Sequence, residues 1–285
     1  MHLSKISSKL PKNGILLEKI LRLNLSVYIK ELLSLEEYAF SFEEVMERTS
    51  KSPVAVKREI SRLIEKQELL NLRQGFYLII PPRYLAVKKL PIQLYVEKLF
   101  AYLERRYYVG LFSAAKFYGA SHQHAQRDYV IIEPPALNPI QKTNIEIQFL
   151  TTSNWPTRNI EAKQSDAGYY RISSPALTFM DLIHYHRKIG GMNRILASLE
   201  ELAEEINDQD VINLLSWYHS KSSLQRAGFL LEELGNQPDL ADIIFDKLRQ
   251  EPFFPVLLSP NKDQKPGATD NRWKIDANLQ LQSDL

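Results

Sequence analysis

The order of apolar and polar residues over the first third of the chain predicts three helical stretches, the first of one or two helices, followed by a hairpin of two strands. In each helical stretch, apolar residues recur three and four positions apart, which gives every helix one face to bury. Two apolar runs then flank Gln74-Gly75, which has the length and the glycine of a tight hairpin turn. The expected helices and strands cover residues 15–33, 41–48, 53–66, 69–73 and 76–80.

Two serines mark where the second and third of these helices begin. Ser41 precedes Glu44 by three residues, the pattern of a capping box, in which each side chain satisfies a free backbone amide of the other residue. Ser52 suits the N-cap of the next helix, and Pro53 suits its first position, where the missing N–H does no harm. The order of these elements predicts a winged helix-turn-helix: a helix, a short helix, a turn, a helix and a hairpin.

The remainder of the chain predicts a second domain, of mixed α/β structure and rich in helices. A connector at residues 82–91 and a helix at 92–103 lead into it. Strands are expected at residues 128–132, 144–150, 159–163, 169–172 and 272–278, the last after a polar loop at 259–270. Helices are expected at residues 176–187, 192–206, 210–219, 222–234 and 240–249. The predicted fold class is therefore α+β, with a winged helix-turn-helix domain at residues 1–90 and the mixed domain at 91–285.

Composition narrows the classes of protein that this chain can represent. The absence of cysteine excludes disulfides, thiolate metal sites and a cysteine nucleophile. No apolar run approaches the roughly 18 residues of a membrane helix, and the start lacks the apolar stretch of a signal peptide, so a cytoplasmic protein is expected. Because no phosphate-binding glycine loop, nucleophile elbow or zinc signature occurs, we expect no enzymatic activity, no cofactor and no metal site.

The distribution of charge favours a DNA-binding role for the first domain. The net charge is only +2, but residues 1–90 hold 16 Lys/Arg and 10 Asp/Glu, whereas residues 91–285 hold 20 and 24. The third helix places its cations opposite the face that it buries. The residues expected to contact DNA are Lys51, Lys57, Arg58, Ser61 and Arg62 around this helix and Arg73 and Gln74 at the wing.

Some of these residues are expected to contact phosphates and others to contact bases. The lysines suit phosphate contacts, whereas Arg58, Ser61 or Arg62 can reach base edges, because the fork of an arginine matches the acceptor pair of guanine. A single winged helix covers a short site, so a dimer on inverted repeats is expected. The alternative is a small α+β domain whose basic face is only solvated.

Several stretches closely resemble the AbiEi family of bacterial antitoxins and transcriptional regulators. They are RQGFYLIIPPRY at 73–84, YYVGLFSAA at 107–115, GASHQ at 119–123, ISSP at 172–175, residues 182–191, RAGFLLE at 226–232, and Arg272-Trp273 with Asn278. The resemblance implies a type IV toxin–antitoxin system of the abortive-infection type. In such a system the antitoxin represses its own promoter and counteracts a toxin encoded next door, typically a nucleotidyltransferase. It also implies a C-terminal domain with an antitoxin role and no catalysis.

Two other functions stay open at this point. One is a stand-alone transcriptional regulator whose C-terminal domain senses a small molecule. The other is a Mg²⁺-dependent nuclease, since Glu161 and Lys163, downstream of Asp128 and Glu146, are similar to the acidic and lysine pattern of restriction-type nucleases. Alternating charges on a solvent-facing strand give the same letters.

Pairs of aromatic and histidine residues have structural interpretations. His122 and His124 have no third ligand nearby, and a role in packing is expected for Tyr107 and Tyr108 beside them. His184 and His186 fall near the end of a predicted helix, where their spacing of two points them to different sides. A cation there would complement the helix dipole.

Overall fold

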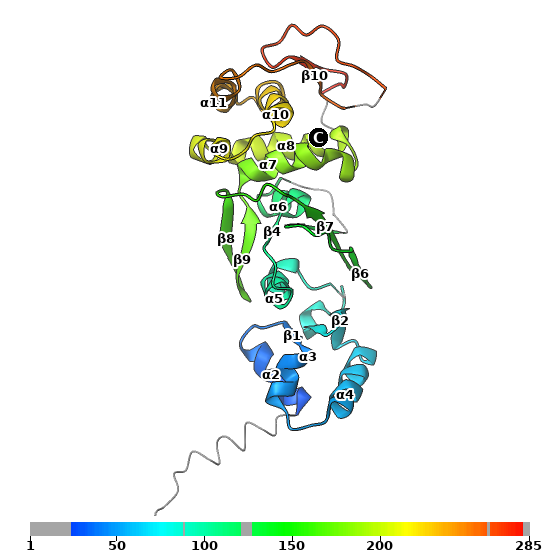
Figure 1. Cartoon of the computed structure of the whole chain (residues 1–285). Coiled ribbons are helices and arrows are strands. Elements are labelled where there is room, and N and C mark those ends of the chain that lie inside the picture. The colour runs from blue at the N-terminus through cyan, green and yellow to red at the C-terminus, as the bar shows by residue number, and fades with distance from the viewer. Residues whose placement is uncertain (1–23, 88, 121–126, 261–262, 282–285) are drawn as a thin grey trace, which may run out of the picture. The chain divides into compact units, whose positions relative to one another are not determined.

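The computed structural model describes residues 24–87, 89–120, 127–260 and 263–281 (Figure 1). The chain divides into two compact units. Unit 1 holds residues 1–103 together with 165–168, and unit 2 holds residues 104–164 and 169–285. The sequence places the division at residue 90, before the helix that closes unit 1. The fold is mixed α+β, as predicted.

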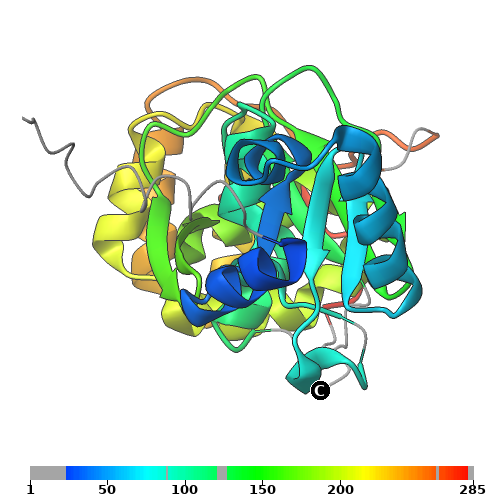
Figure 2. The same ribbon diagram turned by 90° about the horizontal axis from the view of Figure 1, so that it is seen from below.

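Unit 1 combines short helices with a three-stranded antiparallel sheet in the order β1-β3-β2. The three strands lie side by side in Figure 2, with α4 next to β2. Along the chain the elements are α2 (Leu25–Ser34), β1 (Ala39–Ser41), α3 (Phe42–Arg48), α4 (Pro53–Glu65), β2 (Leu69–Arg73) and β3 (Phe76–Ile79). Then follow the 3-10 turns η1 (Pro82–Tyr84) and η2 (Ile92–Leu94) and the helix α5 (Val96–Tyr102).

Side-chain caps fix where α3 and α4 begin, as the sequence predicts. The Ser41 hydroxyl accepts the amide of Glu44 at 3.1 Å, and the Glu44 carboxylate accepts the amide of Ser41 at 2.5 Å, which is a complete capping box. The Ser52 hydroxyl accepts the amide of Ala55 at 3.3 Å, with Pro53 in the first helical turn. The structure describes the helix expected at 15–33 only in part, as α2. Residues 15–23 lie outside the described residues.

The core of unit 1 forms where one face of each helix meets the sheet. Phe40 of β1 stacks on Tyr77 of β3 with ring centroids 5.5 Å apart, and Tyr28 of α2 meets Phe40 edge-on at 6.0 Å. Val56 and Ile60 bury the inner face of α4 in the same cluster. This packing holds α4 by one side and leaves its opposite side to solvent.

Unit 2 is built on a six-stranded sheet in the order β6-β7-β5-β4-β9-β8. Its strands are β4 (Tyr107–Val109), β5 (Asp128–Ile132), β6 (Ile140–Lys142), β7 (Ile145–Thr151), β8 (Ile160–Ser165) and β9 (Gly168–Ser173). Its helices are α6 (Leu111–Phe117), α7 (Pro175–Tyr185), α8 (Met192–Glu205), α9 (Asp208–Leu215), α10 (Lys221–Glu233) and α11 (Pro238–Leu248), with the 3-10 turn η3 (His186–Lys188) after α7. A short parallel pair, β10 (Val256–Leu257) with β11 (Ile275–Asp276), closes the fold.

Helix α10 anchors the C-terminal segment that carries β10 and β11. The Gln225 amide donates to the carbonyls of Phe254 at 2.9 Å and Trp273 at 2.8 Å. Trp273 is fully buried, and its ring lies so close to Gly228 that a Cβ on this glycine would stand 2.1 Å from the indole. The helix therefore needs glycine at this point to admit the tryptophan. Within the described ranges, no helix has the length and apolar character that crossing a lipid bilayer requires.

Candidate nucleic-acid interface

The exposed face of α4 forms a stripe opposite the buried Val56 and Ile60. Val54, Arg58, Ser61 and Glu65 follow one another at intervals of four, three and four residues, so they lie along one side of the helix. All four are exposed, and Val54 keeps 59% of its surface open to solvent. Lys57 and Arg62, also exposed, lie on either flank of this stripe.

Three cations of α4 are available for an anionic partner. Lys57, Arg58 and Arg62 have no acidic partner among the residues that the structure describes. The Lys57 ammonium lies 5.4 Å from the centroid of the Phe42 ring, which directs it toward α3. The Ser61 hydroxyl donates to the carbonyl of Lys57 at 3.0 Å, so its oxygen is left as an acceptor.

Lys51 is placed differently from these three cations. Its ammonium forms an ion pair with Glu59 of α4 and lies 3.4 Å from the side-chain oxygen of Asn24. The Lys51 and Glu59 side chains are about one-third exposed, at 33% and 28%. Glu59 therefore offsets the charge of Lys51 close to the helix, which weakens the attraction of Lys51 for a phosphate.

The turn of the β2–β3 hairpin is held within unit 1. The Tyr102 hydroxyl of α5 donates to the carbonyl of Gln74 at 3.0 Å, and the amide of Phe42 donates to the carbonyl of Gly75 at 2.8 Å. Gly75 has a φ of 75°, which favours glycine at this turn. The Gln74 side chain is exposed, whereas Arg73 is half-buried, and its Nη1 atom is buried without a hydrogen bond to a described residue.

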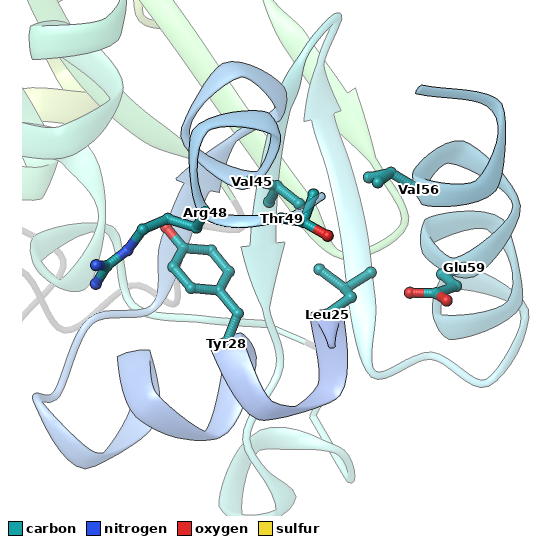
Figure 3. A pocket seen from close by; sticks show the side chains of 7 residues that line it. All are labelled: Leu25, Tyr28, Val45, Arg48, Thr49, Val56 and Glu59. Carbon is teal, nitrogen blue, oxygen red and sulfur yellow. The ribbon is translucent and has the colours of Figure 1, made fainter. Parts of the chain in front are cut away.

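A shallow depression lies where α2, α3 and α4 meet (Figure 3). In Figure 3, Val56 and Glu59 of α4 point toward Val45, Thr49 and Leu25. Burial is the main cause that raises the pKa of Tyr28 to about 12, with smaller contributions from nearby glutamates. Because its lining is mainly apolar and the side chains leave little room, we interpret this depression as the packing seam that orients α4.

Comparison with known proteins identifies much of unit 2. Residues 108–233 match the sequence profile of the AbiEi antitoxin C-terminal domain. These residues form an AbiEi domain. The match begins in β4 and ends with α10, so the AbiEi domain contains all of the six-stranded sheet except β4's first residue, and helices α6 to α10. It confirms the resemblance seen in the sequence over these residues, and the stretches at 73–84 and 272–278 lie outside the match.

A solved structure shares the fold of most of the chain. The crystal structure of the RV2827C protein from Mycobacterium tuberculosis superposes with a TM-score of 0.62 and covers 88% of this chain and 89% of its own. The two sequences are 16% identical, so this likeness concerns the fold alone. Among curated proteins, a sequence search found no match.

The acidic and lysine residues of the nuclease hypothesis lie on strands that are far apart in the AbiEi sheet. Asp128 and Glu146 lie on the neighbouring strands β5 and β7, and Arg127 pairs with Glu146 at 2.9 Å. Glu161 and Lys163 lie on the edge strand β8, separated from β5 by β4 and β9, and they pair with each other at 2.6 Å. The sheet order thus keeps them from forming one cluster, and the described residues contain no group of three His, Asp or Glu side chains that could hold a metal ion.

A buried carboxyl group that sequence reasoning missed lies in the core of the AbiEi domain. The Tyr108 hydroxyl donates to the Asp181 carboxyl at 2.9 Å, and both side chains are buried. Burial raises the pKa of Asp181 from 3.8 to about 7, although the hydrogen bond from Tyr108 lowers it in part. The signal in the sequence was an aspartate in an otherwise apolar helical stretch. Tyr107 is buried too, so both tyrosines pack in the core, as predicted.

The sequence suggested that a histidine near the end of α7 acts there as a cation, and the structure indicates otherwise. His186 is buried, and its Nδ1 atom lies 2.7 Å from the carbonyl oxygen of Ile183. Burial is the main cause that lowers the pKa of both His184 and His186, which favours the neutral rings and not a charge that complements the helix dipole. His122 and His124 lie outside the described residues.

Proposed function

We propose that unit 1 is a winged helix-turn-helix that represses the promoter of its own gene, and that the AbiEi domain counteracts a toxin encoded beside it. The order of helices and strands in unit 1 supports the first part, with α4 as the recognition helix and β2–β3 as the wing. The observation that carries the DNA-binding part is the exposed stripe of α4, flanked by cations without acidic partners among the described residues. The family of the AbiEi domain supports the antitoxin part.

The residues around α4 suit two kinds of contact with duplex DNA. When a helix lies in the major groove, the middle of its exposed face meets the base edges and its flanks meet the two phosphate backbones. Arg58, in the middle, suits the O6 and N7 acceptors of a guanine, whereas Lys57 and Arg62 suit phosphates. Lys51, paired with Glu59, and the wing residues Arg73 and Gln74 are proposed to contribute less.

The proposed partners follow from this arrangement. The duplex is the promoter of the chain's own gene, and inverted repeats read by two copies of the chain would compensate for the short site of one recognition helix. The second partner is the adjacent toxin, a nucleotidyltransferase in the proposed system, which the AbiEi domain opposes whether or not the two proteins touch.

A separation-of-function experiment tests the proposal in cells. The full chain with Lys57→Ala, Arg58→Ala and Arg62→Ala removes the cations of α4, all of them exposed, and leaves the cores of both units unchanged. This variant is expected to lose repression of a reporter driven by its own promoter and to keep rescue of cells that express the adjacent toxin gene. The measurements are reporter activity and colony counts.

The control is Lys247→Ala, which removes an exposed cation from α11 in unit 2. This variant should repress and rescue as the unchanged chain does. Repression by the triple variant would contradict the role of α4. Failure of the unchanged chain to rescue cells from the toxin would contradict the antitoxin role and leave a DNA-binding regulator.

A further inference from the structure

Val54 is an apolar side chain on the polar and basic face of α4, in the first turn of the helix. It is the second residue of the helix and lies four positions before Arg58 and seven before Ser61, on the same stripe. It is 59% exposed, although its neighbours Val56 and Ile60 are buried in the core of unit 1. Packing within unit 1 therefore does not account for an apolar residue at this position.

The place of Val54 along α4 matters as much as its exposure. In helix-turn-helix proteins, the N-terminal residues of the recognition helix are the ones that contact base edges. The flanking cations Lys57 and Arg62 attract the phosphate backbones on both sides, so charge complementarity favours duplex DNA as the occupant of this face. A side chain without donors or acceptors can then recognise just one group in the major groove, the 5-methyl group of thymine.

We infer that Val54 selects a thymine in the operator by contact with its 5-methyl group, next to the base pair that Arg58 reads. This inference rests on the proposed DNA-binding function and deepens it, because it assigns sequence specificity to a residue without charge. Three side chains of the stripe then offer different chemistry to the bases. Val54 offers an apolar group, Arg58 a fork of donors and Ser61 an acceptor oxygen.

Replacement of thymine by deoxyuridine tests the inference, since deoxyuridine pairs as thymine does but lacks the methyl group. The full chain is first footprinted on the DNA upstream of its own gene. Duplexes of that site, each with one thymine replaced by deoxyuridine, are then titrated with the unchanged chain and with Val54→Ala. The matched control is Val27→Ala in α2, because Val27 is 54% exposed and lies outside the α4 stripe.

The expected result is a coupling between one thymine and Val54. At one thymine in each half-site, loss of the methyl group weakens binding by the unchanged chain and by Val27→Ala about 4-fold, the effect of burying roughly one methyl group. The same replacement leaves the affinity of Val54→Ala unchanged. Circular dichroism checks that both variants are folded.

Two results would overturn the inference, and they are distinguishable. If the unchanged chain binds its upstream DNA specifically but Val54→Ala loses affinity on deoxyuridine as the unchanged chain does, or if no thymine matters, Val54 reads no methyl group. If the unchanged chain does not prefer its upstream DNA over a scrambled duplex, the proposed function itself fails and this inference fails with it.

Discussion

At the scale of single residues, the carboxyl group of Asp181 links the stability of the AbiEi domain to pH. Burial raises its pKa to about 7 in the folded protein, while an aspartate in an unfolded chain has a pKa of about 3.9. Between these values the folded state keeps a proton that the unfolded state releases. The stabilisation that this proton provides is therefore complete below about pH 4 and is lost as the pH rises through about 7.

The substitution Asp181→Asn is expected to remove this pH dependence. Asparagine is neutral at every pH, and its carbonyl oxygen can still accept the hydrogen bond from Tyr108. The variant should lose less unfolding free energy than the unchanged protein between pH 4 and 8, and it should be the more stable of the two at pH 8. Urea denaturation across this range, followed by tryptophan fluorescence, measures the difference.

The exposed loop residue Asp270 provides the control for this measurement. Asp270→Asn removes a carboxylate from the surface and should leave the pH profile as it is in the unchanged protein. Parallel profiles for Asp181→Asn and the unchanged protein would show that Asp181 is not the group responsible.

At the scale of single elements, the capping box of α3 sets where this helix begins. Its Ser41 hydroxyl and Glu44 carboxylate each accept a backbone amide that the helix leaves free. Ser41→Ala removes one of these acceptors and is expected to lower the free energy of unfolding of unit 1 by about 1 kcal/mol. Thermal or urea denaturation of the full chain, read from the circular dichroism of the helices, measures the loss.

Two further serine variants show whether the loss of the capping hydroxyl causes the loss of stability in Ser41→Ala. Ser41→Thr keeps a hydroxyl at the cap and suits the short strand β1, so it should stay closer to the unchanged protein than Ser41→Ala does. Ser34→Ala removes an exposed hydroxyl that donates to the carbonyl of Glu31 at the end of α2, and it should change stability by less than about 0.5 kcal/mol. Equal losses for Ser41→Ala and Ser41→Thr would argue against the capping box.

The helices and strands also show which structural features the sequence could predict. The starts of α3 and α4 were predictable because capping is a local interaction within four residues. The strands β1 and β4 were not, because three residues cannot display an alternating pattern, and their pairing partners β3 and β5 lie far along the chain. The helix expected at 210–219 begins earlier, at Asp208, because the Asn207 side chain accepts the amide of Asp210 and caps it there.

For the candidate interface, periodicity was enough to predict which side of α4 carries the cations. It could not predict that Glu59 pairs with Lys51, because the lysine precedes the helix and its reach depends on the loop between them. Nor could it predict that Tyr102 of α5 holds the hairpin turn, since this contact joins residues distant in the sequence.

At the scale of the whole molecule, the N-terminal and C-terminal parts of the chain have opposite charge balances. Residues 1–90 carry an excess of Lys/Arg, and residues 91–285 carry an excess of Asp/Glu. DNA binding through unit 1 is therefore expected to depend steeply on salt, because each phosphate contact releases counterions from the duplex.

The salt dependence should distinguish the lysines of unit 1 from one another. In a plot of log affinity against log salt concentration, Lys57→Ala is expected to reduce the slope by about 1, as the loss of one phosphate contact does. Lys51→Ala should reduce it less, because Glu59 offsets its charge, and Lys247→Ala in unit 2 should leave it unchanged. Equal changes for Lys51→Ala and Lys57→Ala would contradict the distinction drawn from the ion pair.

The close approach of Trp273 to Gly228 also limits how this protein can evolve. Gly228 lies within the AbiEi domain and Trp273 lies beyond it, yet no side chain fits at position 228 while the indole is present. A lineage that replaces the glycine must therefore first shorten the aromatic residue or lose the segment that carries it. Among related chains, the two positions are expected to change together, so the domain and its C-terminal segment are inherited as a pair.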